Sequence, residues 1–414
     1  MQPSLSKPEA GRYIAFLTRA DGPGENATVS TSGKRRLRSE FLFDAIALET
    51  AQAGNVTDVA PASRPLFRVK TTAKHFQDMT GREARSGEWF LLDIVVRHGG
   101  SWVWAAVEDA DSATGFEEVN GFSAAGIQYL DPGGDVGPAQ DADIAKAFLL
   151  VRRTYLVAPS RPDKRPNLFR FLRRAISNAP RLFVEAIDVG QASFVCIHDG
   201  QKSYAYFDAG LPLWFNAKSM PPSPVFFPPH KQAVIVLSHW DYDHYSAIQK
   251  FENLGTLRCI APAGELGPNA GKLAKKMGKR LWALDHGVKI TIGPMKLRWA
   301  TGPVDDRNNR GIIGIVKLPH QKILLTGDAS YTFIKSIYWK NLTGVSIPHH
   351  ASEHSHSAAH VPAPSHPAIA VTSAGHPNKY GHPSGVTISA HRGNSWNVQV
   401  TGAYPSYARG NKRF

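Results

Sequence analysis

The sequence predicts an α+β fold, in which two β-sheets flanked by helices follow a smaller domain of mixed α/β character. From Phe183 onward, short apolar segments alternate with turns, and several of them end in Asp, His or Gly. Such segments are typical of strands that position functional residues in the loops at their ends. The length of 414 residues exceeds that of a usual single core and favours more than one domain.

Residues 1–158 form the predicted N-terminal α/β domain, in which we find no motif that carries chemistry. Aromatic and β-branched residues predict strands at Arg12–Thr18, Phe41–Leu48, Trp89–Arg97 and Trp102–Val107. A helix is predicted at Ala142–Val151, because Asp141 can cap its first turn. The role of this domain stays open.

Residues 159–182 form a predicted basic, proline-rich linker. The chain carries a formal net charge of +14, and basic residues accumulate from Arg152 to Arg181 around a single acid, Asp163. A surface of this kind attracts polyanions, of which nucleic acid is the commonest in a cell. We therefore expect nucleic-acid contacts from four arginines of the linker, namely Arg165, Arg170, Arg173 and Arg174. The alternative is a solvated basic linker without a partner.

Residues 183–414 form the third predicted part, whose pattern is that of two sheets with flanking helices. Strands are predicted at Phe183–Asp188, Ser193–His198, Ser203–Asp208, Ala233–Leu237, Thr256–Ala261, Val288–Thr291, Met295–Thr301, Ile312–Leu318, Lys322–Leu325 and Gly344–Pro348. Helices are predicted at Tyr245–Asn253, Asn269–Leu281 and Tyr331–Trp339.

The densest cluster of potential metal ligands lies in a loop directly after the strand Ala233–Leu237. His239, Asp241, Asp243 and His244 fall within six residues there. His and Asp gather this closely mainly where a metal or catalytic site needs them, although an exposed polar loop is the alternative. The spacing suits two metal ions a few ångströms apart, as two-metal hydrolases require.

Three later segments add candidate ligands. Asp328 follows a buried strand, where a carboxylate can give one oxygen to each of two cations. His349 and His350 end the next predicted strand, and His382 lies in a Gly/Pro-rich loop that also contains His376.

These motifs resemble those of the metallo-β-lactamase domain of ComEC-type DNA-uptake competence proteins. The matching segments are, in chain order, Ile187–Ser193, Phe207–Gly210, His239–His244, Asn308–Gly311, Leu324–Asp328, His349–Ser352 and Asn378–Pro383. The resemblance implies an αββα metallo-β-lactamase sandwich over residues 183–414. Residues 1–182 lie outside it.

The resemblance also implies two divalent metal ions. Zinc is the first choice, and manganese is the alternative because Asp241 offers an oxygen where the superfamily usually has a histidine. One ion would be bound by His239, Asp241 and one of His349 and His350, of which His350 is preferred. The other would be bound by Asp243, His244 and His382, with Asp328 as the bridge.

A metal-activated water that cleaves a phosphodiester bond is the implied chemistry. The expected catalytic residues are Asp243, Asp208, Lys379 and Tyr380. Asp208 would orient a ligand or the nucleophilic water. Lys379 and Tyr380 would contact the substrate, or would only form a loop surface.

Three functions are compatible with the sequence. The first is a nuclease or other phosphodiesterase, and the second is a hydrolase of a small phosphodiester such as a headgroup or a cyclic nucleotide. The third is a nucleic-acid-binding or sensor protein with a structural metal domain.

The sequence has no apolar segment of bilayer length, no signal-peptide pattern and only two cysteines, so we expect a cytoplasmic protein. The natural substrate and the oligomeric state stay open.

Overall fold

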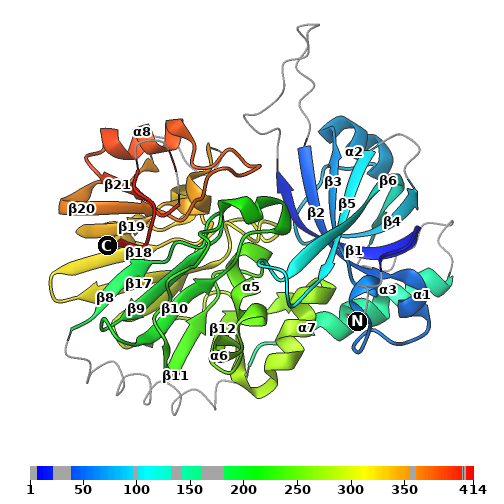
Figure 1. Ribbon diagram of the computed structural model, residues 1–414, viewed down its shortest axis with the longest axis horizontal. Coiled ribbons are helices and arrows are strands. Elements are labelled where there is room, and N and C mark those ends of the chain that lie inside the picture. The colour runs from blue at the N-terminus through cyan, green and yellow to red at the C-terminus, as the bar shows by residue number, and fades with distance from the viewer. Residues whose placement is uncertain are drawn as a thin grey trace, which may run out of the picture. The chain divides into compact units, whose positions relative to one another are not determined.

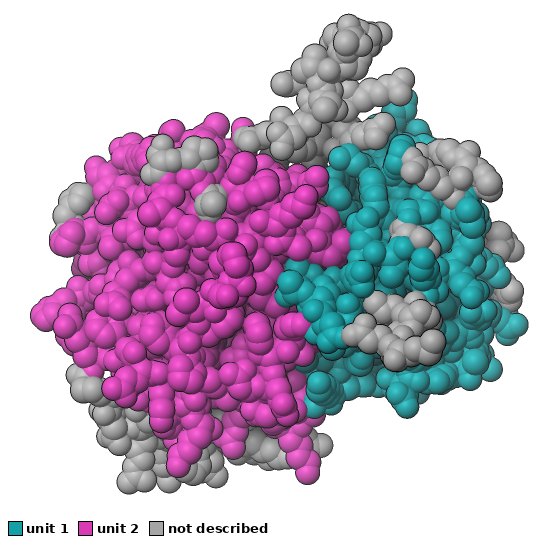
Figure 2. Space-filling view, in the orientation of Figure 1, with its two compact units in different colours: residues 1–157, 264–276 teal, residues 158–263, 277–414 magenta. Residues whose placement is uncertain are grey.

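The computed structural model describes residues 7–21, 39–96, 101–131, 142–160, 181–353, 360–402, 404 and 407–414. The chain divides into two compact units, shown in Figure 2. One comprises residues 1–157 and 264–276, and the other comprises residues 158–263 and 277–414. The four linker arginines, Arg165, Arg170, Arg173 and Arg174, lie outside the described residues.

The first unit contains a closed barrel in which every neighbouring pair of strands is antiparallel. The strands are β1 Gly11–Asp21, β2 Ser39–Ala47, β3 Leu66–Thr71, β4 Trp89–Val96, β5 Ser101–Glu108 and β6 Phe116–Leu130, in the order β1-β2-β3-β5-β6-β4. The helices α1 Leu48–Gln52, α2 Ala73–Thr80 and α3 Ala142–Tyr155 accompany them (Figure 1). Inward-facing aromatic residues such as Phe43, Phe67 and Phe90 fill the barrel. The sequence predicted four of these strands and α3, but not β3, β6, α1 or α2.

A later segment of the chain completes this unit. Strand β13 Gly264–Glu265 pairs with β7 Leu156–Val157, and helix α7 Pro268–Met277 begins against β2. The buried carboxylate of Asp44 accepts hydrogen bonds from the backbone N–H of Asn269 at 3.0 Å and from its side chain at 2.8 Å. Burial raises the pKa of Asp44 to about 6, although these hydrogen bonds act in the opposite direction. The helix N-terminus therefore caps an otherwise costly buried acid.

The second unit is built on two sheets. The first has the order β14-β12-β11-β10-β9-β8-β22, with bounds Leu281–Leu284, Arg258–Pro262, Pro229–Val236, Ser203–Ala209, Phe194–His198, Phe183–Ala186 and Lys412–Arg413. The second has the order β15-β16-β17-β18-β19-β20-β21, with bounds Ile290–Ile292, Met295–Trp299, Ile312–Leu318, Gln321–Leu325, Leu342–Ser346, Pro364–Thr372 and Asn397–Val400.

The two sheets pack face to face, and helices cover their outer faces. Residues of β17 alternate between two cores: Ile312 and Val316 face the first sheet, whereas Ile313 and Ile315 face the outer side. This alternation follows from the two-residue period of a strand. Helix α8 Gly385–Gly393 covers the outer side of the second sheet, and α5 Tyr242–Lys250 contacts β10 of the first (Figure 1). The predicted two-sheet arrangement with flanking helices is thus observed.

One predicted helix is wrong. Residues 331–339 form two short 3₁₀ turns, Tyr331–Phe333 and Ser336–Tyr338, separated by Ile334 in an extended conformation. Aromatic and β-branched residues dominate this segment, and their side chains lose rotamer freedom in a helix.

Among the described residues, no helix is long and apolar enough to cross a membrane.

A buried histidine in α8 makes the stability of the second unit depend on pH. The Nε2 atom of His391 lies 2.9 Å from the hydroxyl of Tyr331, and Nδ1 lies 2.8 Å from the carbonyl of Thr387. Burial lowers the pKa of His391 to about 4, from 6.5 in an unfolded chain. Between these values the unfolded state binds the proton and the folded state does not, so acid favours unfolding.

We therefore expect the free energy of unfolding to fall by up to about 3 kcal/mol as the pH drops from 6.5 to 4. Urea unfolding of the metal-free protein at several pH values measures this. The variant His391→Gln should lack this part of the pH dependence. An equal slope for both proteins would contradict the assignment.

Candidate metal centre

The segment His239–His244 follows β11 of the first sheet and runs into the first turn of α5. The side chains of His239, Asp241, Asp243 and His244 are all buried. The backbone carbonyl of Asp243 accepts a hydrogen bond from Ser193 N at 2.9 Å. It also packs so closely on Gly210 that a Cβ atom there would lie 1.7 Å from it. The loop therefore requires glycine at position 210, and it presents four ligand-type side chains from a fixed backbone.

Asp328 lies at the end of β18 and faces two groups of side chains. Its Oδ1 atom is 3.1 Å from Nε2 of His244. Its Oδ2 atom is 3.5 Å from Nε2 of His349 and 3.8 Å from Nε2 of His239. The two oxygens of one carboxylate are thus directed at separate sets of imidazoles, which is the arrangement of a bridging ligand.

The turn Pro348–Ala351 separates two adjacent histidines. His349, His350 and Ala351 all have positive φ values, of 49°, 54° and 61°. Such conformations cost on the order of 1–3 kcal/mol each for residues other than glycine. Hydrogen bonds hold the turn, among them His349 N to Gly327 O at 3.2 Å. As a result His349 reaches Asp328, whereas Nε2 of His350 lies 3.3 Å from Oδ2 of Asp243.

Acceptors behind two of the imidazoles fix their tautomers. Nδ1 of His244 is 2.8 Å from Oδ2 of Asp208, and Nδ1 of His350 is 2.7 Å from the carbonyl oxygen of Ser373. An acceptor at Nδ1 keeps a proton on that nitrogen, so Nε2 is the atom that can bind a metal once its own proton is released. Asp208 is fully buried and also accepts from Ser238 N at 2.7 Å. It therefore joins the ligand loop to β10.

Several buried polar atoms in the centre lack a hydrogen-bond partner of suitable geometry among the described residues. They are Nε2 of His239, His244 and His350, both carboxylate oxygens of Asp241, and Oδ2 of Asp328. Burying such atoms without partners is costly. Ligand atoms of His239, His244 and Asp328 lie within 4.8 Å of one another, as do those of Asp243, His244 and His350. This donor set of imidazole nitrogens and carboxylate oxygens fits divalent cations such as zinc or manganese.

The charges in the centre are strongly coupled. Burial alone would lower the pKa of His244, but the carboxylates of Asp328 and Asp208 raise it well above its usual value. Burial alone would raise the pKa of Asp328, but His349, His244 and His239 hold it well below its usual range. The carboxylate is therefore ionised and ready to bind a cation.

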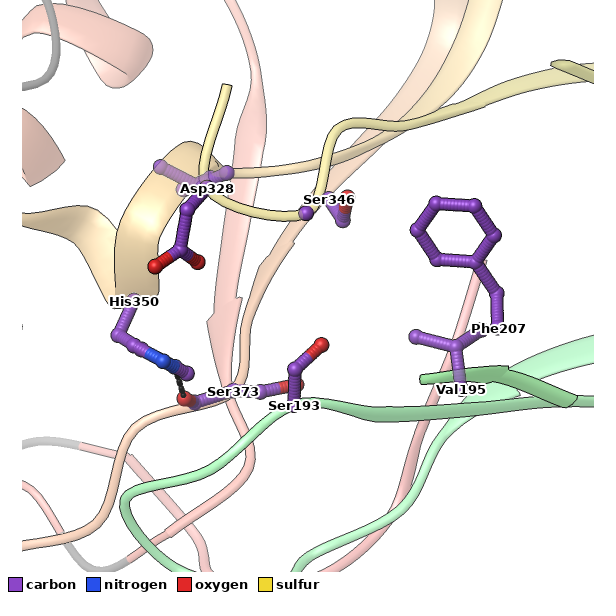
Figure 3. Close-up of a pocket in the computed structure, with 9 residues that line it drawn as sticks. Ser193, Val195, Phe207, Asp328, Ser346, His350 and Ser373 are labelled. Carbon is purple, nitrogen blue, oxygen red and sulfur yellow. Dashed lines mark hydrogen bonds between the residues drawn. The ribbon is translucent and has the colours of Figure 1, made fainter. Parts of the chain in front are cut away.

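Figure 3 shows a small cavity beside the ligands, about 20 Å³ in volume. Asp328 and His350 lie on one side of it, and the hydroxyls of Ser193, Ser346 and Ser373 are also at its wall. A space of this size with several polar partners can hold about one water molecule.

The remaining predicted residues lie around the centre or away from it. The ring of His382 is 5.8 Å from that of His349 and 6.3 Å from that of His350, centre to centre. Tyr380 stacks on His382 at 5.6 Å, and Lys379 on the same loop is exposed. His376 is exposed and its ring contacts that of Tyr404.

Three residues of the site were not predicted from the sequence. Ser238 bonds Asp208, the Ser373 carbonyl holds His350, and the Gln191 side chain contacts His382. Ser238 directly precedes His239, and Gln191 lies in the motif Ile187–Ser193. The recognised motifs therefore contain or adjoin both residues, although no role was predicted for either. The Ser373 contact uses a backbone oxygen, for which side-chain identity gives no signal.

No family model and no curated protein matches the sequence. Solved structures do resemble the fold. They include the metallo-β-lactamase fold protein YhfI from Bacillus subtilis, with a TM-score of 0.36 and 13% identity over 56% of this chain and 100% of that one. Zn²⁺-bound PqqB from Methylobacterium extorquens has a TM-score of 0.35 and 8% identity over 56% and 99%. Tm1679, a metal-dependent hydrolase of the β-lactamase superfamily, has a TM-score of 0.32 and 11% identity over 56% and 98%. These resemblances are distant.

Proposed function

We propose that this protein is a metal-dependent hydrolase that uses two divalent cations to cleave phosphodiester bonds. The observation that carries the proposal is the carboxylate of Asp328, whose two oxygens face different sets of buried imidazoles. The unpartnered atoms around it supply the remaining ligands. Zinc is the first choice for the metal and manganese the alternative.

From the pair distances between side chains we propose two sets of protein ligands, which share the region of the close groups His239–His244–Asp328 and Asp243–His244–His350. His239, Asp241, His349 and Oδ2 of Asp328 form the first set. Asp243, His244, His350 and Oδ1 of Asp328 form the second. The sequence preferred His350 for the first set, but His350 lies beside Asp243 and His349 beside Asp328.

Two bound cations would lower the pKa of a water molecule and neutralise charge on the phosphoryl oxygens. The protein's own residues would do the positioning. Asp208 orients His244 from behind, and the Ser373 carbonyl orients His350. Lys379, which is exposed, and Tyr380, which stacks on His382, would contact the substrate next to the metals.

Nucleic acid is the substrate class that we favour. The net charge of +14, the basic segment 152–181 and the resemblance to the DNA-uptake proteins support it. Arg152 is not available for this role, because it forms an ion pair with Glu265. The nucleic-acid contacts are therefore proposed for Arg165, Arg170, Arg173 and Arg174.

The test compares the wild type with a variant in which these four arginines are changed to glutamine. The wild type should hydrolyse bis-p-nitrophenyl phosphate, lose this activity on chelation and regain it with zinc or manganese. The variant should keep that activity but bind long single-stranded DNA and RNA more weakly, with a flatter dependence of log affinity on log salt. Each lost phosphate contact should reduce the slope by about 0.7–0.9.

A metal-loaded protein that hydrolyses no phosphodiester would refute the proposal. Unchanged polymer binding by the variant would instead favour a small phosphodiester as the substrate.

A further inference from the structure

The side chain of Ser238 lies between the two proposed ligand sets. Ser238 directly precedes His239 and is buried. Its Oγ atom lies 2.9 Å from Oδ2 of Asp208. The same atom lies 3.0 Å from Nδ1 of His239 and 3.3 Å from Nδ1 of His244. The hydroxyl therefore contacts one imidazole of each set, together with the acid behind them.

The packing around Ser238 holds this side chain in place. Its backbone N–H donates to Oδ1 of Asp208 at 2.7 Å, and its carbonyl accepts from Ile312 N at 2.8 Å. Gly327 lies so close that a Cβ atom there would be 2.6 Å from both Cβ and Oγ of Ser238. A Cβ atom at Gly311 would be 2.8 Å from the Ser238 carbonyl oxygen. The fold itself thus fixes the position of the hydroxyl.

The direction of the hydrogen bonds follows from the acid. A carboxylate oxygen can only accept, so the single hydrogen of the Ser238 hydroxyl points to Oδ2 of Asp208. The hydroxyl oxygen then faces Nδ1 of His239 as an acceptor. His244 needs no such intermediate, because its Nδ1 lies 2.8 Å from the same carboxylate oxygen. Each ring therefore has an acceptor at Nδ1, which leaves Nε2 as the atom for a metal.

The orientation of both rings agrees with this assignment. Nε2 of His239 lies 3.3 Å from Oδ2 of Asp241 and 3.8 Å from Oδ2 of Asp328. Turning this ring over would place carbon atoms against the hydroxyl and against both carboxylates. Nε2 of His244 lies 3.1 Å from Oδ1 of Asp328, so turning that ring over would be equally unfavourable. Both rings thus point Nδ1 toward Asp208 or its hydroxyl partner and Nε2 toward the bridging carboxylate.

We propose that Ser238 is a positioning residue whose hydroxyl relays the orienting effect of Asp208 to His239. Asp208 then acts on both metal sets, directly through His244 and indirectly through the Ser238 hydroxyl. An acceptor behind a ligating histidine fixes its ring and raises its basicity. This inference rests on the proposed two-metal function, but it assigns a role to a residue that binds neither metal nor substrate.

The first experiment titrates the metal-free protein with zinc against a competing chelator. The wild type should bind two zinc ions. Ser238→Ala should bind one ion with wild-type affinity and the other about tenfold or more weakly, because only His239 loses its acceptor. Ser193→Ala is the matched control. Among the described contacts, the Ser193 hydroxyl also donates to Oδ2 of Asp208, at 3.1 Å, but does not bridge to His239. Both zinc affinities of this control should stay close to those of the wild type.

The second experiment distinguishes the relay from a local packing role of Ser238. In Asp208→Asn, the amide oxygen can keep its bond from Ser238 N, which leaves the amide nitrogen where Oδ2 accepted bonds. Both zinc affinities should therefore fall. Adding Ser238→Ala to Asp208→Asn should cause little further loss, because the acceptor that Ser238 connects to is already gone. A purely local role of the hydroxyl would instead produce the same additional loss as in the wild-type background.

A third measurement needs no variant. Imidazole NMR spectra of the zinc-loaded wild type should show a proton on Nδ1 of His239 that exchanges slowly with water. In Ser238→Ala this proton should exchange faster, while the Nδ1 proton of His244 should change little. A wild-type His239 without a proton on Nδ1 would contradict the relay.

The outcomes separate this inference from the function it builds on. A wild type that binds fewer than two zinc ions would overturn the proposed two-metal function. A wild type with two ions and a Ser238→Ala variant with unchanged affinities would overturn only the role of Ser238. Equal losses in Ser238→Ala and Ser193→Ala would do the same.

Discussion

Replacing Asp328 with alanine is expected to abolish hydrolysis of bis-p-nitrophenyl phosphate, with a loss in kcat/KM on the order of a thousandfold or more. The carboxylate lies 3.1 Å from His244 and 3.5 Å from His349. Its removal takes one ligand from each proposed set at once. The metal content should fall together with the activity, which elemental analysis after gel filtration measures.

The matched control for this prediction is Asp285→Ala. Asp285 is exposed and lies outside the proposed ligand sets, so this variant should keep both metal content and activity. A fully metal-loaded and active Asp328→Ala protein would show that the centre is not bridged by this residue.

Replacing Asp208 should affect both stability and metal affinity. Asp208 is fully buried, and it contacts Ser238 N at 2.7 Å, Ser193 Oγ at 3.1 Å and His244 Nδ1 at 2.8 Å. In Asp208→Ala these groups lose their common acceptor, and the free energy of unfolding should fall by roughly 3–5 kcal/mol. The affinity for zinc should fall by about 10- to 100-fold, because His244 loses its orienting partner.

Asp208→Asn separates these two effects. Asp208 has a φ of 58°, and asparagine tolerates this left-handed conformation. The asparagine variant should therefore lose less stability than the alanine variant, while zinc still binds more weakly than in the wild type. Denaturant unfolding without metal and zinc titration with a competing chelator measure the two quantities. Wild-type zinc affinity in both variants would rule out an orienting role for Asp208.

The sequence predicted the second unit better than the first, and the reasons are physical. Strands such as β17 Ile312–Leu318 and β18 Gln321–Leu325 are apolar on buried faces and stand out from their polar turns. Strand β6 contains Asn120, Gly121 and Gly126, which have low strand propensity. It was missed because closure of the barrel, and not local preference, makes it a strand.

For the candidate metal centre, the sequence predicted which residue types gather there. It did not predict which of the neighbouring carboxylates each histidine lies beside. The clustering of His239, Asp241, Asp243 and His244 is a local signal. The separation of His349 from His350 arises from a strained turn that tertiary hydrogen bonds hold. Two adjacent identical residues carry no information about such a turn, so the sequence alone could not predict where each of the two side chains lies.

The return of residues 264–276 to the first unit has a consequence for synthesis on the ribosome. Helix α3 and strand β7, which follow the six barrel strands in the chain, have emerged long before α7 is made. Until then Asp44 lacks the N–H groups of Asn269, and the Tyr155 ring lacks the close contact of Gly271. Domains generally fold as units during translation. Here the six barrel strands can pair as they emerge, but the N-terminal unit receives its last segment only more than a hundred codons later.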